Sequence, residues 1–269
     1  MSNITITLCE GQDDIAFLTR ILYINGFEKY NDKLENFIKP FDKLFISNIK
    51  RAEKFGFSPT NYLIPSVVLS KEDNYVLMHN LGGDSDGRSS EIKKILGMYN
   101  GIKSDEDDFS NYDFDYKFLL FFDADEDIAT REKSVCKLIK REIKHNEMSE
   151  NYGLYIFHKD GSGTLEDILL ELMKIGNESV FDSAKKYVEN NKFDDQERCK
   201  EFVCSNSKEE HKGSSKFYEK KSIISVAGQL QFSAKSNSVI IEKSDYIKKV
   251  DLETNNKCKE IADMFMKEL

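Results

Sequence analysis

The sequence predicts an α/β protein built on a parallel sheet with helices on both faces. Apolar, β-rich runs alternate along the chain with helical patterns of 10–17 residues, which is typical of βαβ units. The run "KFLLFF" at 117–122 is apolar without alternation, as expected of a strand that is covered on both faces. Hydrophobic residues make up 39% of the 269-residue chain, which is enough to build a core.

Each element follows from a local pattern. Residues 4–11 ("ITITLCEG") form a β-rich run that ends at a glycine, and 13–26 repeat apolar residues at helical spacing. The segment at about 28–70 holds all three prolines, and we interpret it as an insertion with one helix around 41–55. The remaining elements are, in order, strands at 74–86, 116–127 and 152–160 and helices at 89–99, 129–145 and 164–176.

The chain changes character after these elements. We expect a domain of residues 1–177 and a mostly helical C-terminal region of residues 178–269, with helices at 180–191, 194–205, 222–232 and 256–269. Within this region, residues 208–221 are rich in lysine and poor in apolar residues. Lys208, Lys212 and Lys216 fall at helical spacing on one face, which suits contacts with phosphates, although a solvated surface is the alternative. The candidate nucleic-acid contacts are Lys212, Lys216, Lys220 and Lys221.

The charge distribution separates the two regions. Net charge is −9, so the chain is not coated with positive charge for nucleic acid. Residues 192–269 carry 15 Lys/Arg against 14 Asp/Glu, a net of +1, which leaves −10 on residues 1–191. The five cysteines are scattered and odd in number, which indicates reduced thiols rather than a disulfide framework. With no targeting segment and no membrane-length apolar run, we expect a cytoplasmic protein without membrane contact.

Carboxylates follow the first and third strands. Glu10 ends the first strand, and Asp123 and Asp125 follow the third. Open parallel sheets bind ligands beyond the carboxyl ends of their strands, and side chains two residues apart in a strand point the same way. Adjacent carboxylates resist joint ionisation, so water, a basic partner or a metal ion must offset their repulsion. Oxygen ligands of this kind suit Mg²⁺ or Mn²⁺.

Other acidic and glycine-rich segments have simpler interpretations. Asp13 and Asp14 open a helix, where the helix dipole favours negative charge. Glu126 and Asp127 are interpreted as the start of the helix at 129–145. The stretch "NLGGDSDG" at 80–87 is either a phosphate-binding turn or a plain turn into the next helix.

Taken together, "CEGQDD" and "FFDADED" resemble the Toprim domain, and in particular standalone Toprim proteins and the Toprim domains of OLD-family nucleases. That pattern places a glutamate and a glycine after the first strand and Asp-x-Asp after the third, which here are Glu10, Gly11, Asp123 and Asp125. Many members carry a further acid at the position of Asp14. The stretch "GLYIFHKDGSGTLEDILL" is similar to the later strand and helix of the family, so the resemblance covers about residues 4–175.

The resemblance implies a Rossmann-like Toprim sheet and a nuclease that cleaves DNA or RNA, with a role in defence against mobile elements. It implies one or two Mg²⁺ or Mn²⁺ ions and Glu10 as a general acid or base. Lys159, at the exit of the fourth strand, is a candidate contact to the scissile phosphate, with a solvent-exposed loop lysine as the alternative. The implied metal ligands are Glu10, Asp14, Asp123 and Asp125, with Glu166 or Asp167 completing a second ion site.

The rival interpretation is a non-catalytic, Toprim-like binding or regulatory module. OLD enzymes carry an ATPase module, but this sequence contains no Walker motif, so an ATPase partner would be a separate chain. The sequence leaves open the choice between DNA and RNA and the oligomeric state.

Overall fold

The computed structural model describes residues 2–49, 63–82, 88–104, 114–146, 151–205 and 208–267. Six strands form one sheet in the order β2-β3-β4-β1-β5-β6. The four strands β4, β1, β5 and β6 are parallel, and the short strands β2 and β3 at one end of the sheet are antiparallel to their neighbours, so the predicted α/β fold is confirmed. The strands are β1 (Ser2–Cys9), β2 (Glu28–Lys29), β3 (Val67–Lys71), β4 (Asn74–Asn80), β5 (Phe114–Asp123) and β6 (Tyr152–Phe157).

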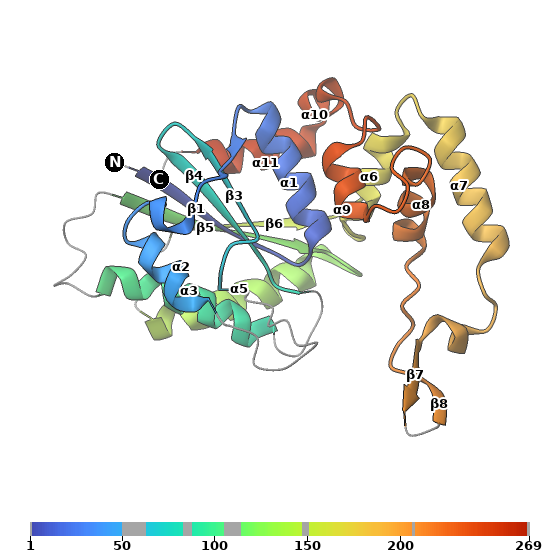
Figure 1. Cartoon of the computed structure of the whole chain (residues 1–269), viewed down its shortest axis with the longest axis horizontal. Coiled ribbons are helices and arrows are strands. Elements are labelled where there is room, and N and C mark those ends of the chain that lie inside the picture. Colours follow the sequence, from blue (N-terminus) through green and yellow to red (C-terminus); the bar gives the residue numbers. More distant parts are fainter. Residues whose placement is uncertain are drawn as a thin grey trace.

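Helices cover both faces of this sheet (Figure 1). The main helices are α1 (Gln12–Ile24), α2 (Phe41–Asn48), α3 (Arg88–Ser104), α5 (Ile128–Asn146), α6 (Leu165–Lys174), α7 (Glu178–Asn191), α8 (Glu219–Gly228), α9 (Asn237–Lys243), α10 (Lys249–Thr254) and α11 (Asn256–Met266). Within the described ranges, no helix has the length and apolarity needed to cross a membrane.

Strand β5 shows why both faces must be covered. Phe118 and Phe122 point into a core shared with α2, α3 and α5, because side chains alternate across a strand. Leu119 and Phe121 point into the opposite core, which is shared with α1, α6 and the C-terminal helices. Since both sets are apolar, the strand reads in the sequence as an uninterrupted hydrophobic run.

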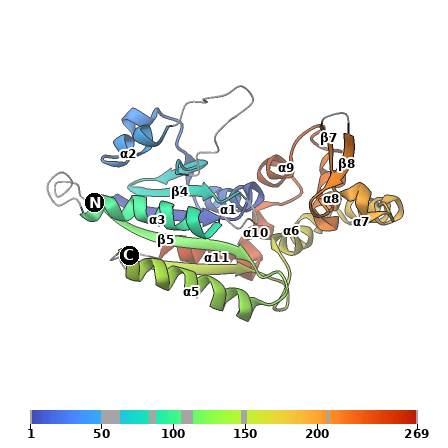
Figure 2. The same cartoon turned by 90° about the horizontal axis from the view of Figure 1, so that it is seen from below.

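The C-terminal region packs into this second core. The ring of Phe265 in α11 stacks on that of Phe121, with centroids 5.7 Å apart and planes at 8°. On α1, the Arg20 guanidinium donates hydrogen bonds to the carbonyl oxygens of Ile241, at 2.8 Å, and Ile247. The last third of the chain therefore completes one face of the sheet, while α6, α7 and α8 lie beyond the carboxyl ends of its parallel strands (Figures 1 and 2).

One predicted helix is wrong. Residues 194–205 form a short 3₁₀ turn followed by strand β7 (Glu201–Ser205), which pairs with β8 (Lys208–Lys212) in a hairpin that projects from the body (Figure 1). Strand formation is favoured by the sequence "FVC", and it places successive side chains on opposite faces. The helical face proposed for Lys208, Lys212 and Lys216 therefore does not exist. Lys212 pairs with Glu210 at 2.6 Å.

The segment at 28–70 is also more integrated than an insertion. Strands β2 and β3 within it extend the sheet at one edge. The helix expected around 41–55 is α2, which ends at Asn48, and residues 50–62 lie outside the described residues. The same holds for residues 83–87 of the glycine-rich stretch at 80–87 and for residues 105–113, which separate α3 from β5.

The packing of α8 against α9 gives a first testable prediction. A Cβ added to Gly228 would lie 2.2, 2.8 and 2.9 Å from three side-chain atoms of Ile240, which is itself fully buried. Gly228→Ala is therefore expected to lower the free energy of unfolding by about 1–3 kcal/mol through overpacking. Urea denaturation measures the loss.

Gly97→Ala in α3 is the matched control, because a Cβ there meets no heavy atom within 4 Å. This control is expected to be neutral or to stabilise the helix by up to about 1 kcal/mol. Equal stability of the two variants would contradict the close approach of α8 and α9 at Gly228.

Candidate functional site

A cavity of about 790 Å³ lies at the carboxyl ends of β1 and β5. It brings together most of the acids predicted from the sequence with two lysines of the distant helix α8. The residues around it are Glu10, Gly11, Gln12, Asp13, Asp14, Asp123, Asp125, Thr164, Glu166, Phe217, Tyr218, Glu219, Lys220 and Lys221.

The first wall of the cavity is the turn from β1 into α1. Gly11 is the N-cap of α1, and its N–H donates a hydrogen bond to Oδ2 of Asp14 at 2.8 Å. Asp14 thus caps the helix with its own carboxylate and is buried at the helix N-terminus, where negative charge is favoured. Burial, followed by the charge of Asp123, nevertheless holds the pKa of Asp14 well above its ordinary value.

The second wall is the exit of β5. Oδ1 of Asp123 accepts a hydrogen bond from the N–H of Leu165, the first residue of α6, at 2.7 Å. Asp125 has a φ of +55°, in the left-handed region that aspartate tolerates better than most residues. Its backbone exchanges two hydrogen bonds with Gly163, at 2.9 and 2.7 Å. The turn "GSG" at residues 161–163 therefore links the start of α6 to the Asp-x-Asp segment through backbone hydrogen bonds.

This geometry corrects the reason given for pairing the two aspartates. The strand ends at Asp123, so the period-two rule does not carry over to Asp125. Both residues still line the cavity. The left-handed backbone of Asp125 and its hydrogen bonds with Gly163 hold the segment after the strand at the cavity. Asp127 caps α5 as predicted, with its Oδ2 accepting from the N–H of Thr130 at 2.7 Å.

The cavity concentrates negative charge. Burial, and then the charge of Glu166, raises the pKa of Asp123 to about 7, although the Leu165 hydrogen bond opposes this. Burial also raises the pKa of Asp13, with Lys221 opposing and Glu166 adding to the rise. Two acids on different elements therefore share one partly desolvated space and resist ionising together.

Lysines of α8 supply positive charge on one side of the cavity. Nζ of Lys221 lies 3.3 Å from Oε1 of Glu166, a residue that is almost fully buried. The other carboxylate oxygen of Glu166, Oε2, accepts from the Thr164 hydroxyl at 2.7 Å. Burial lowers the pKa of Lys221, but the charges of Glu166, Asp13 and Asp14 outweigh it and the pKa is raised overall. Lys221 is therefore a basic partner that offsets part of the repulsion among these carboxylates.

Asp167 has a different role from the one predicted. Its Oδ2 accepts from the N–H of Thr164 at 3.0 Å, so it caps α6 as Asp14 caps α1. The same oxygen accepts from Nζ of Lys220 at 2.6 Å. Burial raises the pKa of Asp167, but the Lys220 bond and the backbone bond bring it below its ordinary value overall. Asp167 caps α6 and does not line the cavity, so the structure does not bring it together with the other predicted metal ligands.

Three further predicted contacts lie outside the cavity. Lys159 forms an ion pair with Glu171 of α6 and does not line the cavity, so the exposed-lysine alternative describes it. Lys212 and Lys216 also do not line the cavity, whereas Lys220 and Lys221 do.

Arg131 is a cation that the sequence analysis missed. From the first turn of α5, its guanidinium donates to Oε1 of Glu10 and lies 4.0 Å from Oδ2 of Asp125. It also sits over the ring of Phe122, 5.3 Å from the centroid. The only sequence signal for it is its place one helical turn after the Asp-x-Asp segment, where a side chain can reach back to the strand end.

The donor set fits Mg²⁺ or Mn²⁺ in its chemistry, since carboxylate oxygens are the ligands that these ions prefer. The raised pKa of Asp123 marks charge that a cation would neutralise. Among the described residues, however, no three His, Cys, Asp or Glu side chains are arranged to hold an ion. Glu10, Glu166 and Asp123 are instead bound by Arg131, by Lys221 and Thr164, and by the Leu165 backbone.

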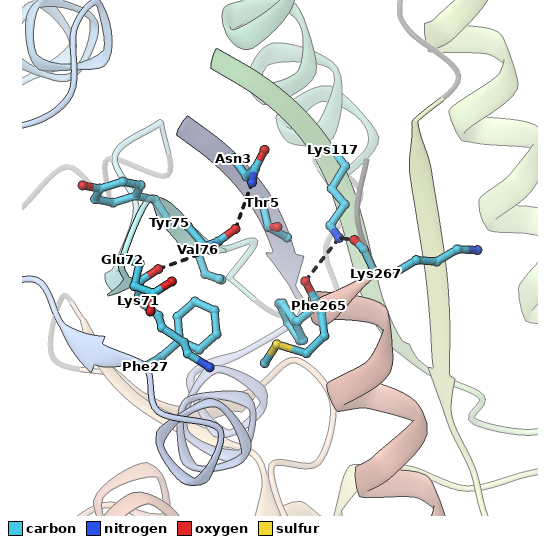
Figure 3. A pocket seen from close by; sticks show the side chains of 12 residues that line it. Asn3, Thr5, Phe27, Lys71, Glu72, Tyr75, Val76, Lys117, Phe265 and Lys267 are labelled. Carbon is cyan, nitrogen blue, oxygen red and sulfur yellow. Dashed lines mark hydrogen bonds between the residues drawn. The ribbon is translucent and has the colours of Figure 1, made fainter. Parts of the chain in front are cut away.

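A smaller cavity of about 260 Å³ lies at the other end of the strands (Figure 3). Nζ of Lys117 points to the last turn of α11, where it donates to the carbonyl oxygens of Met264 and Phe265 at 3.1 and 3.3 Å. Lys71 likewise donates to the carbonyl oxygen of Asn25 at 3.0 Å. Cations at helix C-termini satisfy carbonyl groups, so both lysines stabilise helix ends here.

Comparison with known proteins adds little to this geometry. No protein-family model matches the chain, and no curated protein matches it. One similar solved structure is the crystal structure of hypothetical protein PH0156 from Pyrococcus horikoshii OT3. It is 15% identical, with a TM-score of 0.49 over 98% of this chain and 94% of that one. At this identity and TM-score, the likeness carries no inference about function.

Proposed function

We propose that this protein is a Toprim-type, metal-dependent phosphoryl-transfer enzyme, most simply a nuclease that cleaves phosphodiesters of DNA or RNA. The observation that carries the proposal is the convergence of Glu10, Asp14, Asp123, Asp125 and Glu166 on one cavity at the carboxyl edge of the sheet, opposite lysines of α8. Five carboxylates around one space repel one another, which costs free energy of folding. Clusters of this kind are typical of functional sites.

The groups around the cavity match the needs of phosphoryl transfer. Arg131 and Lys221 can neutralise charge on a phosphodiester, because each already pairs with a carboxylate that a bound cation would relieve. Glu10 is placed to hold or move a proton once Arg131 releases it. Glu10, Asp14, Asp123, Asp125 and Glu166 would hold Mg²⁺ or Mn²⁺. When bound, such an ion orients the phosphate and stabilises charge on the leaving oxygen.

The ion pairs also suggest how the site is kept intact without substrate. Four of the acids have protein donors: Gly11 N–H for Asp14, Leu165 N–H for Asp123, Arg131 for Glu10, and Lys221 for Glu166. These donors hold the carboxylates near one another at a tolerable electrostatic cost. Metal and substrate binding would then exchange these partners, which requires side-chain rotation and no change of fold.

The rival is a binding or regulatory module that partners a separate ATPase chain. The absence of a preformed three-ligand group among the described residues is the observation in its favour. The same ion pairs would then be permanent and structural.

Glu10→Gln separates the two proposals. The purified chain is incubated with single- and double-stranded DNA and with RNA, in Mg²⁺ or Mn²⁺, and products are resolved on denaturing gels. Cleavage by wild type is expected to fall on the order of 100-fold or more in Glu10→Gln, because the variant loses both a cation ligand and a proton acceptor.

Glu171→Gln is the matched control. This glutamate of α6 pairs with Lys159 and does not line the cavity, so its replacement is expected to leave cleavage unchanged. If wild type is as inert as Glu10→Gln on every substrate and with either metal, the nuclease proposal fails and the binding module takes its place.

A further inference from the structure

The rim of the cavity carries an aromatic ring with an open face. Tyr218 lines the cavity, yet 60% of its surface is exposed. A large aromatic side chain beside a charged cavity offers an apolar face on which a flat ligand can stack. On α7, Tyr187 is exposed to the same extent but does not line the cavity.

The backbone of Tyr218 sets the direction in which its side chain leaves the chain. Tyr218 is the N-cap of α8, with an extended backbone at φ −122° and ψ 104°, and its carbonyl oxygen accepts from the N–H of Ser222 at 2.9 Å. The preceding residue, Phe217, is packed against the hydrophobic core that α8 shares with the sheet. Since successive residues of an extended segment face opposite ways, the anchored Phe217 turns the Tyr218 ring outward.

Positive charge lies next to the ring. Nζ of Lys221 is 5.8 Å from the centroid of Tyr218 and 3.3 Å from Glu166 inside the cavity. Lys220, also in the first turn of α8, pairs with Asp167 at the start of α6. One helical turn therefore presents a flat apolar surface and two ammonium groups at the mouth of an acidic cavity.

We infer that Tyr218 stacks on an unpaired base beside the phosphate held at the cavity, so that the substrate is a single-stranded nucleic acid. Single-strand binding sites combine aromatic rings that stack on bases with cations that follow the phosphates. In a duplex both faces of a base are covered by its neighbours, so a ring on a concave rim reaches a base only where the strand is unpaired. This inference rests on the proposed function for the identity of the cavity as the phosphodiester site.

The absence of tryptophan from the chain provides a direct test. Tyr218→Trp introduces a single indole at the rim, and Tyr187→Trp introduces one at the equally exposed control position. Both are combined with Asp123→Asn, which the proposed function predicts to be unable to cleave, so fluorescence reports binding alone. Each protein is titrated in Mg²⁺ with a single-stranded oligothymidylate, a single-stranded oligouridylate and a blunt DNA duplex of equal length.

Saturable quenching of the indole at position 218 by a single strand supports the inference, provided that the duplex causes little quenching and that the indole at position 187 is little affected. Comparison of the two single strands then shows whether DNA or RNA is preferred. In the tyrosine background, Tyr218→Ala is expected to weaken single-strand binding by about 5- to 100-fold, and Tyr218→Phe to retain it. Equal quenching by duplex and single strand, equal quenching at both positions, or no quenching at position 218 would overturn it.

Failure of this inference is distinguishable from failure of the proposed function. Cleavage that requires Glu10, without quenching at position 218, removes the stacking role alone. Quenching at position 218 without cleavage by wild type keeps single-strand stacking and removes the nuclease.

Discussion

Asp123→Asn is expected to stabilise the folded chain at about pH 8 while lowering cleavage on the order of 100-fold or more. Activity falls because the amide cannot serve as a charged cation ligand. Stability rises because the folded state holds this carboxyl in a buried, acidic setting that raises its pKa to about 7, against 3.8 ordinarily. A residue whose removal helps folding and harms activity is typical of a functional site.

The pH dependence of this stabilisation has a definite sign. Because the pKa of Asp123 is raised on folding, the folded state binds more protons than the unfolded state between about pH 4 and 7. Its contribution to stability is fully present below the unfolded pKa and is lost as the pH rises through 7. Asp123→Asn should therefore gain about 1–3 kcal/mol at about pH 8 and almost nothing at about pH 4, as measured by urea denaturation at both pH values.

Metal ions provide a second readout for the same variant. Mg²⁺ or Mn²⁺ is expected to raise the melting temperature of wild type at about pH 8, because ligands that bind only the folded state stabilise it. The rise should be absent from Asp123→Asn.

Asp115→Asn serves as the control, since Asp115 lies near the amino end of the same strand, outside the cavity. This variant should cleave and respond to metal as wild type does. Equal stability gains for the two variants, or a metal response that survives in Asp123→Asn, would contradict the assignment.

Gly163→Ala is expected to cost about 2–4 kcal/mol of stability and to abolish cleavage. Gly163 has a φ of +95°, which alanine adopts only with strain, and an added Cβ would lie 2.4 Å from Oδ2 of Asp167. That oxygen is held by the Thr164 N–H and by Lys220, so relief of the clash would break the cap of α6 and its link to α8. The backbone bridge to Asp125 would move with it.

Gly161→Ala isolates the backbone contribution. Gly161 has nearly the same φ, +94°, but a Cβ there meets nothing within 4 Å, so only backbone strain of about 1–2 kcal/mol is expected. Urea denaturation compares the two variants, and cleavage is measured at a temperature where both are folded. If Gly161→Ala were as damaging as Gly163→Ala, the Asp167 contact would not be what makes Gly163 necessary.

Asp123 belongs to the part of the site that local sequence patterns anticipate best. The strand ends are visible in the sequence because an apolar run that meets a glycine or an acid marks a buried strand leaving the core. Parallel order then places Glu10 and Asp123 at the same edge, and the structure brings both to one cavity. Capping by Asp127 is similarly local, since it depends on a side chain and an amide three residues apart.

The errors arise where a residue's environment depends on distant segments. Asp167 resembled a cavity residue in the sequence, but Lys220, 53 residues later, pairs with it at the cap of α6. The lysines at 208–216 fit a helical face, yet pairing between β7 and β8 decided their conformation. Strand β3 lies within a segment that looks irregular in the sequence, because it forms by pairing with β2 and β4.

Local patterns in the sequence predict the alternation of strands and helices, the covered sheet and the acids at its carboxyl edge, because periodicity and capping are local properties. Which cations face those acids depends on the three-dimensional packing of the chain. This packing places Arg131 against Glu10, Lys221 against Glu166, and the ring of Tyr218 at the rim. Lys221 and Tyr218 reach the cavity because the C-terminal region packs on the sheet, and that packing is set by apolar contacts such as Phe121 with Phe265, far from the site's own residues.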